Sequence, residues 1–450
     1  MPLAQALALL VPLSGCGLFG GGGGNAKLGV TPPPKPVFGF AVAPDPEAAI
    51  AARHVLLEGG NAVDAATAAG FVLAVTLPSR AGLGGGGACL IYAPHNATSP
   101  TPKPVSLLFL PRAAANAAGA DRPAAVPEMA RGLIAMQARY GQLSLAADMA
   151  PAETLAGGGA PVSRALAADL RVVGGALTAD PAAAAVFAPS GSLLGPGQIM
   201  RQPDLAATLG ALQTGGALDL VQGSLASQFV AAADQAGGGL DLADLRRAAP
   251  RYAPPLTMTH GGISLAFLPP PAYGGTGAMA GFRALAANPQ DLNAAAQAAA
   301  SASFAAEGVK TAPAALPAST GFAALDGQGG IVACATTMNN LFGTGRIAPG
   351  TGILLAASPA HVPPPLLAAG IAYRGGKFRA AATGSGQQGA PMAVADALYN
   401  ALGSGRPMPS PVPQPGRANV IACSGFMPGD PKSCAAAADP RGFGLATGSP

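Results

Sequence analysis

The chain has 450 residues, of which half are hydrophobic and only 10% are charged, and its net charge is +4. This composition excludes a disordered chain, which combines low hydrophobicity with high net charge. The charges are also too sparse to form a basic stripe for nucleic acid. The length fits one large domain or two to three ordinary ones with a substantial core.

The first 16 residues resemble a bacterial lipoprotein signal. An apolar run ends in Leu13-Ser14-Gly15-Cys16, a pattern in which the cysteine becomes the lipidated first residue. The run is too short to span a bilayer. It carries no Lys or Arg, so a truncated start or a chance apolar end are the alternatives. We expect an exported, periplasmic protein, anchored by lipid at Cys16, with a Gly/Pro-rich tether over residues 17–39.

The five cysteines fit an exported protein. Cys423 and Cys434 lie close together in a Gly/Pro-rich segment and can form a disulfide in an oxidising compartment. Cys89 and Cys334 lie inside apolar runs, so we expect them to be core thiols. No cysteine pair has metal-ligand spacing and the histidines are dispersed, so we expect no metal and no cofactor.

Helix signals follow the tether. Residues 46–58 predict a helix that Asp45 can cap and that two glycines end. Asn61, with Asp64 three residues later, forms a variant of the capping box. Residues 65–75 are apolar almost all round, which predicts a buried second helix.

The pattern then alternates between strands and helices. Strands are predicted at residues 88–92, after a glycine run, and at 105–110, where the strand leads to Arg112. Residues 126–256 indicate helices joined by polar or Gly-rich turns. Residues 291–319 are rich in Ala and Ser and are expected to form an exposed, mobile connector.

The last third begins with a hairpin signal. Residues 321–325 and 331–336 flank a segment that contains one Asp, one Gln and three Gly. A strand is predicted at 378–383 and a helix at 392–402. Helices, then strands, then helices favour an α+β fold in which helices cover sheets.

Short stretches spread along the chain match one known family in order. Residues 59–66 (GGNAVDAA), followed by the glycine run at 84–87, look like the opening signature of the gamma-glutamyltransferases. The matching series continues over nearly the whole remaining chain. It comprises residues 139–141, 201–209, 269–271, 274–275, 339–345, 349–355 and 439–442.

The resemblance implies a fold and a mechanism. The family fold is the four-layer αββα sandwich of the N-terminal-nucleophile hydrolases. Its precursor cuts itself, and the hydroxyl at the new N-terminus attacks gamma-glutamyl amides. The free α-amino group serves as the base, so no histidine is needed. The chain would divide into a large portion, residues 40–318, and a small portion, 319–450, which stay associated in one domain.

The match also assigns residues to roles. Counting back from Asp326, the nucleophile position falls on Ser319; if the register slips by one residue, Thr320 is the nucleophile. Thr337 matches the threonine that assists the nucleophile. Asn339 matches the residue that holds the substrate α-amino group.

Two further matches concern anionic groups. Arg112 matches the arginine that grips the substrate α-carboxylate, for which a planar guanidinium is suited. The glycine pair of the oxyanion hole falls on Gln387 and Gln388. Glutamine still offers a backbone N–H, although close approach of the backbone is easier with glycine.

Departures from the family pattern concentrate in the substrate pocket. The acidic pair that binds the substrate amine falls on Ala360 and His361, and the paired serines fall near Leu366 and Leu367. The glutamate that usually follows the arginine is Ala113. A pocket without these groups has lost much of its grip on a zwitterionic glutamyl group.

Three readings remain open. The first is a gamma-glutamyl hydrolase or transferase acting on small-molecule amides. The second is an amidase or acylase on the same scaffold, in which Leu366 and Leu367 would line an apolar pocket. The third is an inactive envelope lipoprotein that kept the fold. The hydroxyl of Ser319, with Thr337, Asn339 and Arg112, favours the first two, and the lost pocket residues favour the last two.

Overall fold

The computed structural model describes residues 38–94, 102–115, 117–309, 316, 318–363, 366–408 and 410–449. They belong to one compact unit, Val37–Pro450. A second unit, Met1–Pro36, lies outside the described residues, as do Cys16 and nearly all of the expected tether. Among the helices in the described ranges, none combines the length and apolar character needed to cross a membrane.

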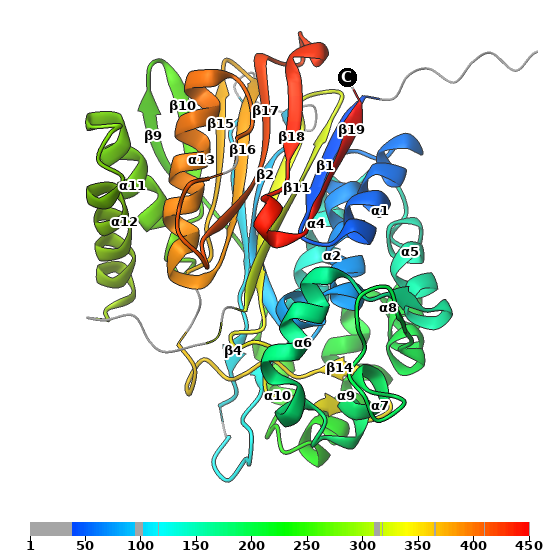
Figure 1. Ribbon diagram of the computed structural model, residues 1–450. Helices are drawn as coiled ribbons and strands as arrows, with labels where there is room; N and C mark the ends of the chain where they lie inside the picture. Colours follow the sequence, from blue (N-terminus) through cyan, green and yellow to red (C-terminus); the bar gives the residue numbers. More distant parts are fainter. Residues whose placement is uncertain are drawn as a thin grey trace, which may run out of the picture. The chain divides into compact units, whose positions relative to one another are not determined.

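Two large antiparallel sheets form the centre of this unit (Figure 1). The first sheet has seven strands, in the spatial order β19 (Leu445–Ser449), β1 (Gly39–Ala43), β11 (Ser319–Asp326), β12 (Ile331–Thr337), β2 (Gly86–Tyr92), β3 (Val105–Phe109) and β8 (Arg251–Ala253). The second has six, in the order β18 (Cys434–Ala437), β17 (Arg417–Met427), β16 (Lys377–Ser385), β15 (Ala369–Arg374), β10 (Ile263–Phe267) and β9 (Leu256–His260).

Helices cover the outer face of each sheet (Figure 1). On the first sheet's side lie α1 (Pro46–Leu57), α2 (Ala62–Thr76), α3 (Pro78–Ala81), α4 (Met129–Tyr140), α5 (Leu145–Gly158), α6 (Arg164–Leu177), α7 (Pro181–Phe187), α8 (Pro203–Gln222), α9 (Ser224–Gln235) and α10 (Leu242–Arg247). On the second sheet's side lie α11 (Gly274–Ala287), α12 (Leu292–Glu307) and α13 (Ala390–Ser404).

Short elements connect these layers. They are the two-stranded pairs β4 (Arg112–Ala113) with β5 (Ala125–Val126), β6 (Ala160–Pro161) with β7 (Ile199–Met200) and β13 (Ile347–Ala348) with β14 (Ile353–Leu354), and the 3-10 turns η2 (Gln387–Gly389), η3 (Pro431–Ser433) and η4 (Pro440–Gly442).

The sheets stack because alternate residues of their strands are apolar on both faces. In β11, Ala323 and Leu325 pack between the sheets, against residues such as Ile371 of the second sheet. Phe322 and Ala324 point the other way and join the core under the helices. The expected arrangement of sheets covered by helices is therefore confirmed.

The capping box at the start of α2 ties this helix to the central hairpin. Asn61 Oδ1 accepts hydrogen bonds from the N–H groups of Val63 and Asp64, and Asp64 Oδ2 accepts one from the Asn61 N–H. Asp326, which ends β11, accepts a bond from the Ala62 N–H at 3.1 Å. A carboxylate at a helix N-terminus is electrostatically favourable, so this contact fixes one end of β11.

Both sheets mix strands from before and after residue 319. In the first sheet, β11 from the later part pairs with β1 and β12, and β12 pairs with β2 from the earlier part. In the second sheet, β10 from the earlier part pairs with β15 from the later part. Neither portion could keep its sheets without the other.

The expectation of an exposed, mobile connector at residues 291–319 is largely wrong, because residues 292–307 form α12. Alanine favours helix, and Asp291 caps the helix by accepting from the Ala294 N–H. Ala295, Ala299 and Ser303, four residues apart, form its buried face. The low complexity of the segment concealed this stripe.

The expectation of free core thiols at Cys89 and Cys334 is also wrong. The register places Cys334 of β12 directly opposite Cys89 of β2, with Cα atoms 4.0 Å apart, and the two form a disulfide. Cross-strand pairing brings together residues that are 245 apart in sequence, which the sequence does not indicate. The disulfide between Cys423 and Cys434 is present as expected.

Candidate active site

Ser319 is the first residue of β11 and is fully buried. It lies directly opposite Thr337 of β12, which in turn lies opposite Gly86 of β2. By the alternation of the strand, Ser319 shares a face with Ala323 and Leu325, which pack between the sheets. The hydroxyl groups of Ser319 and Thr337 are therefore cross-strand neighbours on the face toward the second sheet.

Thr320 has the opposite orientation. It shares its face with Phe322, on the helix side of the sheet, and it lines a small cavity with Arg80 and Asp439. Only Ser319 lies on the same face as Thr337. The geometry thus separates two neighbouring hydroxyls that spacing alone could not.

A backbone N–H reaches the Ser319 hydroxyl. The Gln387 N–H donates to Ser319 Oγ at 3.4 Å, from η2 between β16 and α13. Gln387 has a positive φ of 51°, and its side-chain Oε1 is buried without a hydrogen-bond partner among the described residues. Gln388 lies in the same turn and is exposed. The backbone of Gln387, one of the two predicted oxyanion-hole positions, thus contacts Ser319.

The turn after β12 contacts Ala318, which precedes Ser319, and Thr337, which lies opposite it. The Met338 N–H donates to the carbonyl oxygen of Ala318 at 3.3 Å. The Asn339 N–H donates to Thr337 Oγ1 at 2.8 Å, and the Asn339 side-chain amide donates to the Ala357 carbonyl, also at 2.8 Å. Asn339 has a φ of 61°, a conformation that asparagine tolerates better than most residues. These bonds fix Thr337 and Asn339 relative to Ser319.

A cavity of about 360 Å³ begins beside this turn. It brings together Arg112 and Asn339, the two side chains predicted to hold the substrate's charged groups. Sequence reasoning missed two other polar lining residues, Arg251 and Tyr273, which follow no motif. The remaining lining residues are Leu108, Leu110, Pro111, Ala113, Pro271 and Pro359.

Arg112 is half-exposed and anchored at two points. Its Nη2 donates to the Ala249 carbonyl at 3.1 Å, and its Nε lies 3.9 Å from Oε1 of Glu128. Glu128 lies close to Arg112 because β4 pairs Arg112 with Val126 of β5, two residues before Glu128. Glu128, which sequence reasoning also missed, therefore lies beside the arginine although the family position for a glutamate is Ala113.

The Glu128 carboxyl is completely buried, and neither oxygen accepts a hydrogen bond from the described residues. Burial raises the pKa of Glu128 to about 7, while the positive charges of Arg131 and Arg112 oppose the rise. Burial thus favours the neutral form of a carboxyl that lies 3.9 Å from Arg112 Nε.

The positions that depart from the family pattern do not rebuild the lost contacts. Ala360 and His361 are exposed. Leu366 and Leu367 are buried, and Leu367 belongs to the core between the sheets. Neither leucine lines the 360 Å³ cavity, so the apolar pocket expected for the acylase reading is not formed by them. No Asp or Glu lines this cavity among the described residues.

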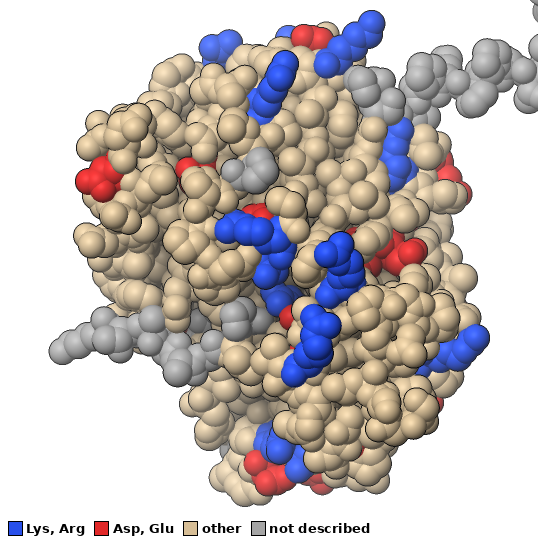
Figure 2. Space-filling view, in the orientation of Figure 1, with Lys and Arg blue, Asp and Glu red and all other residues tan. Residues whose placement is uncertain are grey.

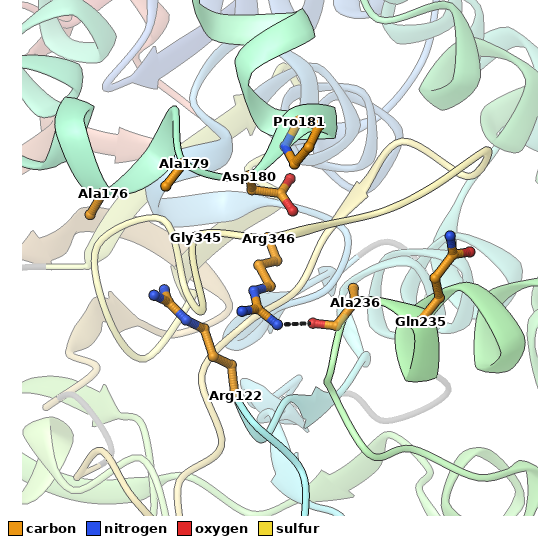
Figure 3. Close-up of a pocket in the computed structure, with 9 residues that line it drawn as sticks. All are labelled: Arg122, Ala176, Ala179, Asp180, Pro181, Gln235, Ala236, Gly345 and Arg346. Atoms are coloured by element: carbon orange, nitrogen blue, oxygen red, sulfur yellow. Dashed lines mark hydrogen bonds between the residues drawn. The ribbon is translucent and has the colours of Figure 1, made fainter.

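A second cavity, of about 250 Å³, also contains two arginines (Figure 3). Arg122 and Arg346 point into it from two loops, and both are already partnered. Arg346 donates to the Ala236 carbonyl at 2.8 Å and forms an ion pair with Asp121; Arg122 donates to the Thr344 carbonyl at 2.8 Å. The two arginines bind carbonyl groups of a loop and of a helix end. Their role in this cavity is therefore structural.

Charge is sparse over the described surface. Uncharged side chains cover most of the face shown in Figure 2. Across the described ranges, no group of three or more His, Cys, Asp or Glu side chains could hold a metal ion. The candidate site has two parts: the buried hydroxyls of Ser319 and Thr337 with their backbone N–H donors, and the arginine-lined cavity, which Asn339 lines and Ser319 does not.

Comparison with known proteins identifies a family to which the sequence is similar. A sequence model described as gamma-glutamyltranspeptidase matches residues 48–315. Glutathione hydrolase 2 of Arabidopsis thaliana is 31% identical over 235 residues, which are 50% of this chain and 40% of that protein. The acylase ACY 1 proenzyme of Pseudomonas sp. (strain SE83) is 32% identical over 255 residues, 53% of this chain and 46% of that protein. The chain spans about half the length of these curated relatives.

A solved structure supports the fold. The crystal structure of cephalosporin acylase from Bacillus halodurans matches with a TM-score of 0.75 at 20% identity, over 94% of this chain and 99% of that one. At this identity the likeness concerns the fold alone. It agrees with the two stacked sheets between helix layers, and the N-terminal-nucleophile hydrolase sandwich expected from the sequence is confirmed.

Proposed function

Because the chain belongs to the gamma-glutamyltranspeptidase family, we propose that it is an enzyme that cuts itself before Ser319 and then acts on gamma-glutamyl amides, passing the acyl group to water or an amine. The observation that carries the proposal is the placement of Ser319. Its buried hydroxyl lies opposite Thr337 and accepts the Gln387 N–H.

The first step is self-cleavage. Ser319 Oγ attacks the carbonyl carbon of Ala318, and the negative charge develops on the oxygen that the Met338 N–H contacts. The Ala318–Ser319 C–N bond then breaks and the nitrogen takes the hydroxyl proton, which leaves an ester. Water hydrolyses this ester to a carboxylate on Ala318, a free hydroxyl and a new α-amino group on Ser319.

The second step uses this new N-terminus. The α-amino group has a reference pKa of about 7.7–8.0, so an appreciable fraction can accept the hydroxyl proton near neutrality. Ser319 Oγ then attacks the substrate amide, and the Gln387 N–H is the donor available to the oxyanion. The amine leaves with the proton, and water or an amine takes the acyl group from the ester.

The cavity supports a gamma-glutamyl substrate through two residues. Arg112 would bind the α-carboxylate, and Asn339, next to the catalytic turn, would hold the α-amino group. An amide oxygen is a weaker partner for an ammonium group than a carboxylate is. No Asp or Glu lines the cavity in the described part of the chain, so the side chain of Asn339 would have to bind the amine without a carboxylate.

The second candidate function is an acylase. It is favoured by the absence of any Asp or Glu among the described lining residues, and by the exposure of Ala360 and His361. Such a pocket suits an acyl group with a carboxylate and no ammonium group. A relative whose printed name is an acylase proenzyme supports this alternative.

Two features support lasting association of the two fragments. Each sheet contains strands from both portions. The disulfide between Cys89 and Cys334 joins a residue before the proposed cut to one after it. We therefore expect one disulfide-linked, two-fragment protein after cleavage.

The disulfides also bear on the compartment. Two intramolecular disulfides are typical of proteins in oxidising environments. They support the proposed export to the periplasm, whereas the proposed lipid at Cys16 rests on the sequence pattern that ends at this residue. Radiolabelled palmitate in the wild type, lost in Cys16→Ala, would support the anchor; an unlabelled wild type would contradict it.

The function is tested with purified protein. A reducing denaturing gel should resolve two fragments, and gamma-glutamyl p-nitroanilide should be hydrolysed with release of p-nitroaniline. The corresponding glutaryl anilide, which lacks the α-amino group, separates the two candidates. Preference for the glutaryl compound would favour the acylase, and a persistent single chain would leave the inactive lipoprotein.

A further inference from the structure

We propose that Arg251 is a second carboxylate-binding residue of the cavity, and that Arg251 and Arg112 together select acyl donors that carry a carboxylate. This inference rests on the proposed function and assigns a specificity-determining side chain that no motif indicates.

The fold brings the two arginines to one place from separate strands. β8 is the edge strand of the first sheet, and its register pairs Arg251 with Leu108 of β3. The chain continues from β3 to Arg112 within a few residues. Leu108, Arg112 and Arg251 all line the 360 Å³ cavity. Arg112 also donates to the carbonyl of Ala249, just before β8, which ties the two segments together.

Arg251 is available for a ligand. Its guanidinium forms no ion pair or hydrogen bond within the part of the chain that the structure describes. The arginines of the second cavity differ, because Arg122 and Arg346 donate to carbonyls and Arg346 also pairs with Asp121 (Figure 3). An arginine that lines a cavity and lacks a protein partner can offer its planar donors to a carboxylate.

The charge around the cavity favours an anion. Its described lining residues include two arginines and no Asp or Glu. The carboxyl that pairs with Arg112, that of Glu128, is completely buried and does not line the cavity. A cavity with positive walls attracts anionic ligands and concentrates them.

Arg251 also compensates for polar groups that the family's pocket has and this pocket lacks. The positions of the family's paired serines are taken by Leu366 and Leu367, which are buried and do not line the cavity. Arg112 alone spends one donor on Ala249. Arg251 would supply the N–H groups that the missing hydroxyls would otherwise offer to the carboxylate.

The test compares two donors that differ only in this carboxylate. They are gamma-glutamyl p-nitroanilide and the same compound with its α-carboxylate converted to a carboxamide. Arg251→Gln should raise KM for the carboxylate donor about tenfold, as expected for loss of a charge-assisted hydrogen bond, with little change in kcat. It should not affect the carboxamide donor. Arg251→Lys, which keeps the charge, should recover part of the loss.

Arg122→Gln, in the second cavity, is the matched control and should leave both KM values unchanged. An equal effect of Arg251→Gln on both donors, or no effect on either, would overturn the inference.

Binding can be measured without turnover. Calorimetric titration with glutarate should show weaker binding to Arg251→Gln than to the wild type; equal binding, or none to the wild type, would also overturn the inference. Self-cleavage is read separately on a reducing gel. A protein that binds glutarate through Arg251 but stays a single chain would contradict the proposed function alone.

Discussion

The region around Ser319 and the arginine-lined cavity differ in the kind of groups that form them. Around Ser319 the contacts come from backbone N–H groups, those of Gln387, Met338 and Asn339. In the cavity the polar groups are side chains, and Arg251 lacks a partner among the described residues. Backbone donors survive a change of residue, whereas side-chain recognition does not. This explains how the chain can keep the catalytic geometry while its substrate pocket departs from the family.

The largest effect is expected from a substitution at Ser319. Ser319→Ala removes the only hydroxyl that faces Thr337 from β11, so neither self-cleavage nor hydrolysis should occur. Thr320→Val is the matched control, because Thr320 lies on the opposite face of the sheet. It should still be cut. Cleavage in Ser319→Ala together with its loss in Thr320→Val would move the nucleophile to Thr320.

A smaller effect is expected at Thr337. Thr337→Val removes the acceptor of the Asn339 N–H and leaves a buried donor unsatisfied. This costs about 1–3 kcal/mol, which corresponds to a fall in kcat of roughly fivefold to 150-fold if it is lost from transition-state stabilisation. Thr337→Ser keeps the acceptor and should retain most activity. Steady-state kinetics would contradict the assignment if the valine variant matched the wild type.

Beside the cavity, Glu128 should make the free energy of unfolding depend on pH. The pKa of Glu128 is raised to about 7 by burial, so the folded state keeps a proton that the unfolded chain loses at lower pH. This contribution to stability is present at acidic pH and is lost as pH rises toward 7, with a slope of at most about 1.4 kcal/mol per pH unit. Glu128→Gln should lessen the fall in unfolding free energy between pH 5 and pH 8, measured in urea.

Asp148 lies away from the cavity, and the pKa of its carboxyl is raised to about 8 by burial and by the nearby charge of Asp64. Asp148→Asn is therefore a second variant that should reduce the same slope. If Glu128→Gln leaves the slope unchanged while Asp148→Asn reduces it, Glu128 is not protonated in the folded protein.

The smallest effect on activity concerns the disulfide between Cys89 and Cys334. Cys334 faces the helix-side core, away from Ser319, so replacing both cysteines by alanine should leave hydrolysis unchanged. The fragments of the cut wild type should run as one band without reductant, and those of the variant as two. Two bands from the unreduced wild type would show that this disulfide does not form.

Local patterns predicted much of the fold. The capping box at Asn61 and the hairpin around Asp326 depend on residues near in sequence, and both were found as expected. Helix α12 was missed because the stripe of Ala295, Ala299 and Ser303 is hidden in a segment of similar small residues.

The site was only partly predictable for a related reason. Arg112 and Asn339 were found through the resemblance, and the structure places them in one cavity. Arg251 and Glu128 reach that cavity or its arginine only through strand pairing between β3 and β8 and between β4 and β5. The bond between Cys89 and Cys334 likewise depends on the register of β2 and β12. Such long-range pairings are not visible in spacing along the chain.

The central claim is that Ser319 becomes an N-terminus. The most direct measurement is N-terminal sequencing of the smaller fragment, separated under reducing conditions from protein purified without added protease. The account predicts a single sequence that begins Ser319-Thr320-Gly321. A fragment that begins at any other residue, or a chain that remains whole, would contradict it.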